Sequence, residues 1–335
     1  MKNTDQNILT DTFGRTHTYL RVSLTERCNL RCTYCMPANG IPLSPKESLM
    51  TADEIFTISQ EFVALGVTKI RLTGGEPMVR KDFPQILEKL ASLPIEIGIT
   101  TNGILADRYL LLLQKNNIKT ITISIDSMQQ DKFEQITRRD EFKRVWKTIQ
   151  LYQDNGFLVK LNIVLIKGFN DNEIINFIQL TQHRNLTIRF IEFMPFDGNQ
   201  WNMDKLVTQQ EILDKVNYTF PLQVKRMKDA PHDTSRNYKI EGFSGSFSII
   251  SSVTNPFCDT CNRIRLTADG KLKNCLFSGH EFSLLKPLRE SQSIQTVIKK
   301  ALQSKFATRG GMDTPEKIQN PNLHSRNRSM IAIGG

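Results

Sequence analysis

The sequence predicts an α/β fold built on a parallel sheet, and two observations support this prediction. Between residues 18 and 195, short runs rich in β-branched residues alternate with longer stretches of helical periodicity. Strands and helices that alternate in this way form parallel pairs through right-handed crossovers. Unusual motifs stand directly after several strand candidates, where α/β proteins bind ligands. Such a sheet forms either an open doubly wound layer or a barrel, complete or incomplete.

Each element of this region is predicted from its own pattern. The strand candidates are Tyr19–Leu24, Lys69–Thr73, Glu96–Thr100, Thr120–Ile125, Val159–Ile166 and Thr187–Met194. The helices expected between them are Ala52–Leu65, Asp82–Leu93, Tyr109–Asn116, Phe142–Asp154 and Glu173–His183. The first helix also carries a start signal, because Thr51 with Glu54 three residues later is typical of a capping box.

The pattern changes after about residue 195. The elements expected there are a helix over Gln209–Val216, strands over Leu222–Met227, Tyr238–Ile240 and Phe247–Val253, a hairpin of Arg263–Leu266 with Lys271–Asn274, and a helix over Ile294–Lys305. The tail from Thr308 to Gly335 is expected to be weakly structured. We therefore divide the chain into an α/β domain, residues 1–200, and a C-terminal α+β domain, residues 201–335.

The composition narrows the classes of function. With 335 residues, of which 39% are hydrophobic, the chain can bury a substantial core. No apolar run approaches the roughly 20 residues that span a bilayer, and residues 1–14 lack the apolar segment of a secretory signal. We therefore expect a cytoplasmic protein without a membrane partner. The formal net charge of +10 favours an anionic partner, which could be a nucleic acid, an acidic surface or a polyphosphate.

The six cysteines form two groups of three, a pattern that suits two metal sites better than three disulfides. The first group, Cys28, Cys32 and Cys35, lies in a loop that leaves the first strand. Three thiolates can hold a [4Fe–4S] cluster and leave its fourth iron open to a small molecule. Structural zinc takes four ligands, and no fourth Cys or His is nearby in the sequence, so we interpret this group as a cluster site.

The second group, Cys258, Cys261 and Cys275, again offers three thiolates. His280 lies five residues after Cys275 and would complete a zinc site with three Cys and one His ligand. The spacing alone therefore fits zinc and an iron–sulfur cluster equally well.

Basic residues recur within the predicted strands. Alternation places Lys69 and Arg71 on one face of their strand, and Arg21 and Lys160 are placed likewise in theirs. Cations facing the middle of a sheet are costly without a partner, and a triphosphate would supply one, since arginine suits bidentate phosphate contact. Because these cations are spread over separate strands and point inward, we expect no nucleic-acid partner.

Two motifs resemble those of the radical S-adenosylmethionine superfamily. Residues 28–35 match its CxxxCxxC signature, and residues 74–77 match its GGEP motif, which contacts the methionine amino group. The resemblance implies that the open iron chelates S-adenosylmethionine and that an electron from the cluster releases a 5′-deoxyadenosyl radical. The residues that it implies in S-adenosylmethionine binding are Tyr34, Gly75, Glu76, Ser124 and Met194.

From Arg21 to Gly335 the chain also resembles the GTP 3′,8-cyclase family, lyases that begin molybdenum cofactor synthesis. This resemblance implies an incomplete (β/α)6 TIM-like barrel whose open side is closed by a C-terminal α+β domain. It further implies a second [4Fe–4S] cluster on the second cysteine group, with an open iron that binds the guanine of GTP.

The same resemblance implies substrate contacts and a reaction. The residues implied to contact GTP are Arg21, Lys69, Arg71, Thr100, Lys160, Arg189, Arg263 and Arg265. The terminal Gly334 and Gly335 are implied to enter the active site and assist catalysis, where only glycine fits so tight a space. The radical would abstract the ribose C3′ hydrogen, and the C3′ radical would attack guanine C8 to give 3′,8-cyclo-7,8-dihydro-GTP.

The implied partners are GTP, an electron donor and a downstream cyclic pyranopterin monophosphate synthase, and a homodimer is left open. Two rival interpretations are a radical S-adenosylmethionine peptide maturase, which also has cysteine-rich C-terminal modules, and a zinc-binding nucleic-acid module. Metal analysis separates the last from the cyclase, because the cyclase predicts brown protein with about eight irons per chain and the zinc module predicts colourless protein.

Overall fold

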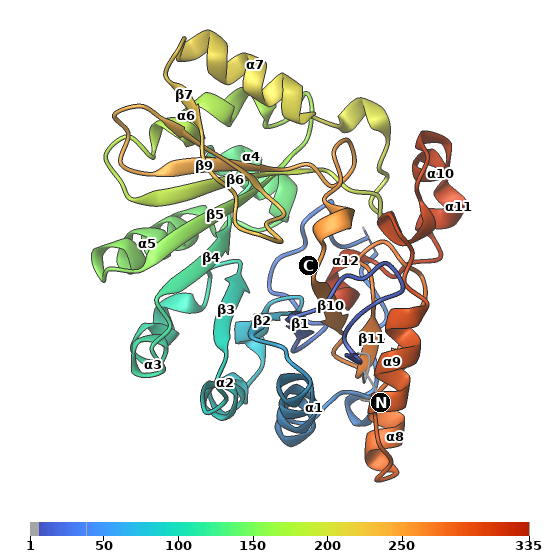
Figure 1. Ribbon diagram of the computed structural model, residues 1–335. Coiled ribbons are helices and arrows are strands. Elements are labelled where there is room, and N and C mark those ends of the chain that lie inside the picture. Colours follow the sequence, from blue (N-terminus) through green and yellow to red (C-terminus); the bar gives the residue numbers. More distant parts are fainter. Residues whose placement is uncertain (1–6, 38, 335) are drawn as a thin grey trace.

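The computed structural model describes residues 7–37 and 39–334 of the chain. Six strands from the first 200 residues lie side by side in chain order and are all parallel (Figure 1), which confirms the predicted α/β fold. They are β1 (Tyr19–Ser23), β2 (Lys69–Thr73), β3 (Glu96–Thr101), β4 (Thr120–Ser124), β5 (Leu158–Leu165) and β6 (Leu186–Glu192).

Strands from the second half of the chain extend the same sheet at both edges. β9 (Ser246–Ile250) pairs in parallel with β6, and β10 (Arg263–Leu266) pairs in parallel with β1. The antiparallel strands that follow outward are β8 (Arg236–Ile240) and β7 (Val224–Arg226) at one edge, and β11 (Lys271–Lys273) and β12 (Phe282–Ser283) at the other. The described residues thus form one sheet of twelve strands, in which β1 and β6 are not paired with each other.

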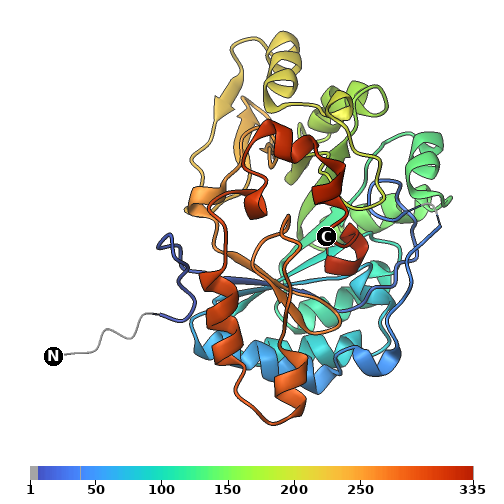
Figure 2. The same ribbon diagram turned by 90° about the vertical axis from the view of Figure 1, so that its right-hand side faces the viewer.

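Helices cover the outer face of this curved sheet, and the end of the chain lies on its inner side (Figures 1 and 2). The helices of the first half are α1 (Ala52–Ala64), α2 (Phe83–Ala91), α3 (Leu110–Lys115), α4 (Gln130–Thr137), α5 (Phe142–Asp154) and α6 (Ile174–Gln179). Those of the second half are α7 (Gln209–Thr219), α8 (Leu285–Arg289), α9 (Gln295–Gln303), α10 (Pro315–Gln319), α11 (Pro321–His324) and α12 (Met330–Ile333). The capping box is confirmed, since Thr51 Oγ1 accepts from Glu54 N at 3.2 Å and Glu54 Oε2 accepts from Thr51 N at 2.7 Å.

Two expectations about helices are corrected. α4 was not predicted, because it buries only Phe133, Ile136 and Thr137 and so shows little apolar periodicity. The expectation of a weakly structured tail is wrong, since α10, α11 and α12 lie within it and Ile318, Ile331 and Ile333 are buried. Helices of four or five residues are too short to give a periodic signal in the sequence.

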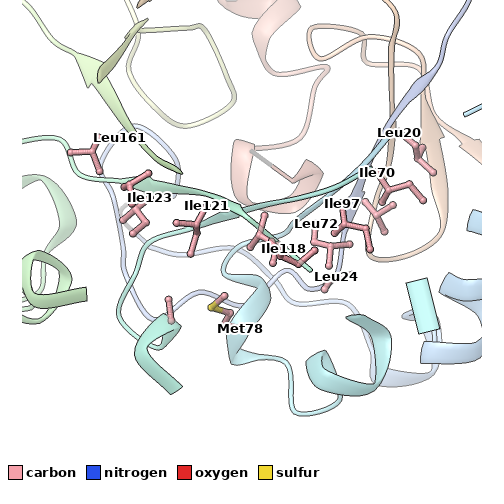
Figure 3. Close-up of a cluster of buried hydrophobic side chains, with 14 of the residues drawn as sticks. Leu20, Leu24, Ile70, Leu72, Met78, Ile97, Ile118, Ile121, Ile123 and Leu161 are labelled. Atoms are coloured by element: carbon pink, nitrogen blue, oxygen red, sulfur yellow. The ribbon is translucent and has the colours of Figure 1, made fainter. Parts of the chain in front are cut away.

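The two faces of the sheet differ in chemistry. Alternate residues of the central strands are buried aliphatic side chains that pack against the helices, as the cluster around Ile70, Leu72, Ile97, Ile121 and Ile123 shows (Figure 3). Each such side chain contributes about 1.5–3 kcal/mol by burial. The residues between them point to the inner face and are mostly polar, because alternation along a strand reverses the face at each step.

Candidate active site

Arginines form a row across the inner face of the sheet. In the strand register Arg265 of β10 is opposite Arg21 of β1, which is opposite Arg71 of β2. Neighbouring strands lie about 4.8 Å apart, so the three arginines start from adjacent positions on one face, and burial together with the charges of Arg265 and Arg71 lowers the pKa of Arg21. Arg71 is opposite Gly98 of β3, where an added Cβ would lie 3.0 Å from the Arg71 Cζ. Gly98 therefore leaves the space that the Arg71 side chain occupies.

The row continues with polar side chains on β3 to β6. Arg71 Nη1 donates to Thr100 Oγ1 at 3.3 Å and to Thr122 Oγ1 at 3.1 Å. Lys160 is in register with Thr122, and Arg189 with Asn162. Ser124, at the end of β4, is also in register with Asn162. The residues of this row that were predicted to contact GTP or S-adenosylmethionine are Arg21, Arg71, Thr100, Ser124, Lys160, Arg189 and Arg265.

Two of the residues predicted to contact GTP, one arginine and one lysine, lie nearer the start of their strands. Arg263 and Lys69 are both in register with Tyr19 of β1. Arg263 Nη2 donates to Thr234 Oγ1 at 2.6 Å, whereas Lys69 Nζ forms a 2.6 Å ion pair with Glu96. Lys69 thus has an anionic partner in Glu96 of the neighbouring strand.

The electrostatics of the row favour an anionic ligand. Burial and neighbouring guanidinium groups lower the pKa of Arg189 and that of Arg265 to about 10, and burial and Arg265 lower the pKa of Arg21. The buried Asn162 Oδ1 and Arg263 Nε have no hydrogen-bond partner among the described residues. A charged polar ligand would stabilise the crowded cations and satisfy such atoms.

The first cysteine group lies in the loop after β1. Burial is the main cause that raises the pKa of each thiol, to about 11 for Cys28, and the charges of other members of the group raise the pKa of Cys32 and Cys35 further. The three thiols are therefore close together, in a place where a bare thiolate is unfavourable. Metal ions stabilise thiolates, so the chemistry of this donor set fits an iron–sulfur cluster.

The GGEP motif supports this loop directly. Gly75 N donates to Thr25 O at 2.7 Å, and Glu76 N donates to Arg27 O at 2.8 Å. An added Cβ on Gly75 would lie 2.4 Å from Arg27 O and 3.2 Å from Cys28 Cβ. The contact therefore requires glycine at position 75.

The Glu76 side chain joins the ends of two strands. Its buried carboxylate accepts hydrogen bonds from Asn102 N at 2.6 Å, Thr101 Oγ1 at 2.8 Å and Met78 N at 3.1 Å. Asn102 Nδ2 in turn donates to Asn29 Oδ1 at 2.7 Å and lies 3.6 Å from Cys28 Sγ. The Glu76 carboxylate thus connects the segments after β2 and β3, and Asn102 extends this connection to the cysteine loop.

Asn199 links Tyr34 to Met194, and Asp126 binds Tyr34; neither Asn199 nor Asp126 was predicted as a site residue. Tyr34 OH donates to Asp126 Oδ2 at 2.8 Å, and burial raises the pKa of Asp126 to about 6. Asn199 Nδ2 donates to Met194 O at 2.8 Å and to Tyr34 O at 3.2 Å. Asp126 and Asn102 stand in motifs directly after β4 and β3, so their place in the sequence was the signal that could have found them.

The second cysteine group is built from the segment between β9 and β10 and the end of β11. Burial and the charges of Cys275 and Cys261 raise the pKa of Cys258, so these thiols are also neighbours. His280 is exposed, and its ring centroid lies 6.2 Å from that of Phe306. In the described residues no three Cys, His, Asp or Glu side chains converge on one point as the ligands of a single metal ion would. A four-iron cluster makes no such demand, because its thiolates bind separate irons.

The tail of the chain reaches the arginine row. Gly334 O accepts a hydrogen bond of 2.5 Å from Arg265 Nη1. Gly334 has a φ of 77°, and an added Cβ would lie 2.7 Å from Thr73 Oγ1 and 2.9 Å from Ser23 Cβ. The position therefore requires glycine, while Gly335 lies outside the described residues.

Comparisons with known proteins cover both halves of the chain. Residues 22–181 match the family model for the radical SAM superfamily, and residues 186–310 match the model named Molybdenum Cofactor Synthesis C. The chain is 38% identical over 332 residues to the GTP 3′,8-cyclase of Alkaliphilus oremlandii, covering 97% of this chain and 99% of that protein. The chain belongs to the GTP 3′,8-cyclase family.

Other members of the GTP 3′,8-cyclase family differ in length. The chain is 47% identical over 335 residues to the mitochondrial GTP 3′,8-cyclase of Arabidopsis thaliana, covering 98% of this chain and 84% of that protein. It is 46% identical over 320 residues to molybdenum cofactor biosynthesis protein moc-5 of Caenorhabditis elegans, covering 92% and 53%. The chain thus spans about half the length of this relative and of the one from Drosophila melanogaster, of which it covers 50%.

Among solved structures, Streptococcus suis SuiB has the same fold. The TM-score is 0.57 at 15% sequence identity, over 78% of this chain and 60% of that chain.

The helices of this GTP 3′,8-cyclase family member were also compared with the requirements of a membrane span. Within residues 7–37 and 39–334, none of them combines the length and the apolar character needed to cross a bilayer.

The Glu76 carboxylate gives this family member a testable pH dependence. Burial raises its pKa from 4.5 to about 7, so the folded state binds the proton more tightly than the unfolded state does. The stabilisation is present below pH 4.5 and is lost as the pH rises through about 7, a change of roughly 3 kcal/mol in the free energy of unfolding. Denaturant titrations across this range should show that Glu76→Gln removes this part of the pH dependence. Parallel curves for the two proteins would contradict the prediction.

Proposed function

We propose that the chain is a GTP 3′,8-cyclase that converts GTP to 3′,8-cyclo-7,8-dihydro-GTP in molybdenum cofactor synthesis. The observation that carries this proposal is the arginine row, in which Arg265, Arg21 and Arg71 are aligned across three strands and Gly334 contacts Arg265. A compact set of cations on the inner face suits a triphosphate. The first cysteine group follows β1, and the second lies before β10, which pairs with β1, and after β11.

Each cysteine group would hold one [4Fe–4S] cluster. When bound, the cluster on Cys28, Cys32 and Cys35 supplies the electron that cleaves S-adenosylmethionine to the 5′-deoxyadenosyl radical. Family resemblance assigns guanine binding to the cluster on Cys258, Cys261 and Cys275. The three thiols of the second group fit this role, because they are neighbours and three thiolates leave the fourth iron of such a cluster open.

The chain's own residues bind and orient the substrates. Arg21, Arg71 and Arg265 would hold the triphosphate, and Lys160 and Arg189 extend the positive charge towards β6. Holding GTP with its ribose C3′ near the radical is the main contribution of the protein, since the cofactors carry the difficult chemistry. Gly334, held by Arg265, would help to exclude water from this site.

For the architecture, we propose an incomplete (β/α)6 barrel in residues 1–200, closed by a C-terminal domain in residues 201–335. Support comes from β1 and β6, which pair with β10 and β9 of the second half and, within the described sheet, not with each other. An electron donor, a downstream cyclic pyranopterin monophosphate synthase and a homodimer are proposed partners. A cytoplasmic location stays a prediction from the sequence.

Anaerobic incubation with GTP, S-adenosylmethionine and a reductant tests this proposal. We expect 5′-deoxyadenosine and cyclised GTP to form together, and about eight irons per chain in the purified protein. If neither 5′-deoxyadenosine nor cyclised GTP formed under reducing conditions, the result would rule out the cyclase and favour a peptide maturase.

The Cys261→Ala variant tests the division of labour between the two sites. We expect it to bind S-adenosylmethionine as the wild type does and to bind GTP much more weakly, because only the second site would contact guanine while the arginine row would still contact the triphosphate. Isothermal titration with each ligand measures both affinities. Equal loss of both would show that the division of labour is wrong.

A further inference from the structure

The segment before β1 lies against the second cysteine group. Arg15 comes from this segment, and its side chain is 8% exposed. Its Nη1 donates to Cys258 O at 2.8 Å and to Ala307 O at 2.8 Å, and its Nη2 donates to Phe306 O at 3.0 Å. One guanidinium group thus joins the N-terminal segment, the loop that carries Cys258 and the chain that follows α9.

Asp11 fixes the orientation of this guanidinium. Its buried carboxylate accepts from Arg15 Nε at 2.7 Å and from the backbone N–H groups of Phe13 and Arg15 at 2.9 and 3.1 Å. His17 Nε2 lies 3.1 Å from the same carboxylate, and its side chain is fully buried. Arg15 is therefore held in place by its ion pair with a buried carboxylate that is itself fixed by other protein groups.

Lys305 makes corresponding contacts with the rest of the group. It is 6% exposed, although lysine is rarely buried, and its Nζ donates to Asn274 O at 2.7 Å and to Arg263 O at 3.2 Å. Asn274 directly precedes Cys275, and Arg263 is two residues after Cys261. The two cations therefore bind backbone carbonyls within two residues of each of the three cysteines.

The turn after Lys305 contributes to the same site. Arg309 N lies 3.4 Å from Cys258 Sγ and donates to it. Gly310 has a φ of 62°, and an added Cβ there would lie 2.6 Å from Ser278 N, three residues after Cys275. The chain after α9 thus packs tightly against both ends of the cysteine group.

We propose that Arg15 and Lys305 are positioning residues for the second metal site. They hold the backbone at Cys258, Cys261 and Cys275 so that the three thiolates face one cluster, because these loops have few ladder hydrogen bonds of their own. The N-terminal segment is then a part of the second site, although it lies more than 240 residues away in the sequence. The identity of the metal in this inference rests on the proposed function. The contacts that Arg15 and Lys305 make with the cysteine loops do not depend on it.

The test uses the full chain with Cys28, Cys32 and Cys35 replaced by alanine, so that bound metal reports on the second site alone. After anaerobic reconstitution we expect about four irons per chain in this parent. Adding Arg15→Ala or Lys305→Ala should lower iron and sulfide at least fourfold, and Arg15→Lys should restore part of the loss. Arg289→Ala is the matched control, because Arg289 likewise joins a carboxylate, of Glu54, to the carbonyls of Glu47 and Leu49, on other elements.

A second measurement separates positioning from general damage. In the chain with all six cysteines, Arg15→Ala should keep the iron of the first site and its reductive cleavage of S-adenosylmethionine. Two results for Arg15→Ala would overturn the inference. One is loss of iron from both sites, and the other is a full iron content at the second site with an unchanged absorption spectrum. Zinc in the parent would overturn the two-cluster function. The positioning role of Arg15 and Lys305 would then be tested by comparing the zinc content of the parent with that of Arg15→Ala and Lys305→Ala, and an unchanged zinc content would overturn it. A parent without metal would overturn both.

Discussion

Replacing Gly75 by alanine is expected to empty the first cysteine site and to abolish the formation of 5′-deoxyadenosine. The added Cβ would lie 2.4 Å from Arg27 O and 2.7 Å from Arg27 C, which are backbone atoms that cannot rotate away. Relief requires the β2 loop and the cysteine loop to separate, and overpacking of this kind costs about 1–3 kcal/mol or more. The shift would break the bonds from Gly75 N to Thr25 O and from Glu76 N to Arg27 O.

Iron analysis and detection of 5′-deoxyadenosine measure the effect of Gly75→Ala. We expect the iron content to fall from about eight to about four per chain, since the second site does not depend on this contact. Gly156→Ala is the control, because nothing lies within 4 Å of an added Cβ at that position. If Gly75→Ala kept its first-site iron and its cleavage activity, the tight contact would not position the cysteine loop.

The central sheet could be predicted from the sequence because each strand carries its own signal. The predicted bounds of β2 agree with the structure, and those of β1 and β4 differ by one residue. β-branched residues and alternation are local properties, so no tertiary information was needed. The continuation of the sheet through β9 and β10 could not be predicted in the same way, since pairing between strands far apart in the sequence leaves no local pattern.

In the candidate site, too, features set by local sequence could be predicted and features set by tertiary contacts could not. Alternation alone could assign Arg21 and Arg71 to one face of their own strands, whereas Arg265 was expected from the family resemblance; the strand register places the three opposite one another. The partners of site residues could not be read from the sequence, because they depend on tertiary contacts. Glu96 beside Lys69 is one example, and the protein donors around the Glu76 carboxylate are another.

Replacing Gly334 by alanine is expected to stop cyclisation while the cleavage of S-adenosylmethionine continues. Gly334 has a φ of 77°, which disfavours alanine, and the added Cβ would meet Thr73 Oγ1 at 2.7 Å and Ser23 Cβ at 2.9 Å. The tail must then move away from β1 and β2 and lose the bond from Arg265 Nη1 to Gly334 O. Since a displacement of about 1 Å at an active site can cost a hundredfold in rate, we expect cyclised GTP to fall by about that factor.

Gly242→Ala separates backbone strain from steric conflict in this experiment. Gly242 has a φ of 81°, close to that of Gly334, but nothing lies within 4 Å of an added Cβ there. Both variants place alanine at a positive φ, 77° and 81°, so the clash with Ser23 and Thr73 is the main difference between them. Cyclised GTP and 5′-deoxyadenosine are measured in the same reaction, and their ratio reports whether radicals still form without productive transfer. A normal ratio in Gly334→Ala would show that the tail contacts Arg265 without a role in the reaction, whereas a low ratio in Gly242→Ala as well would attribute the effect to general strain.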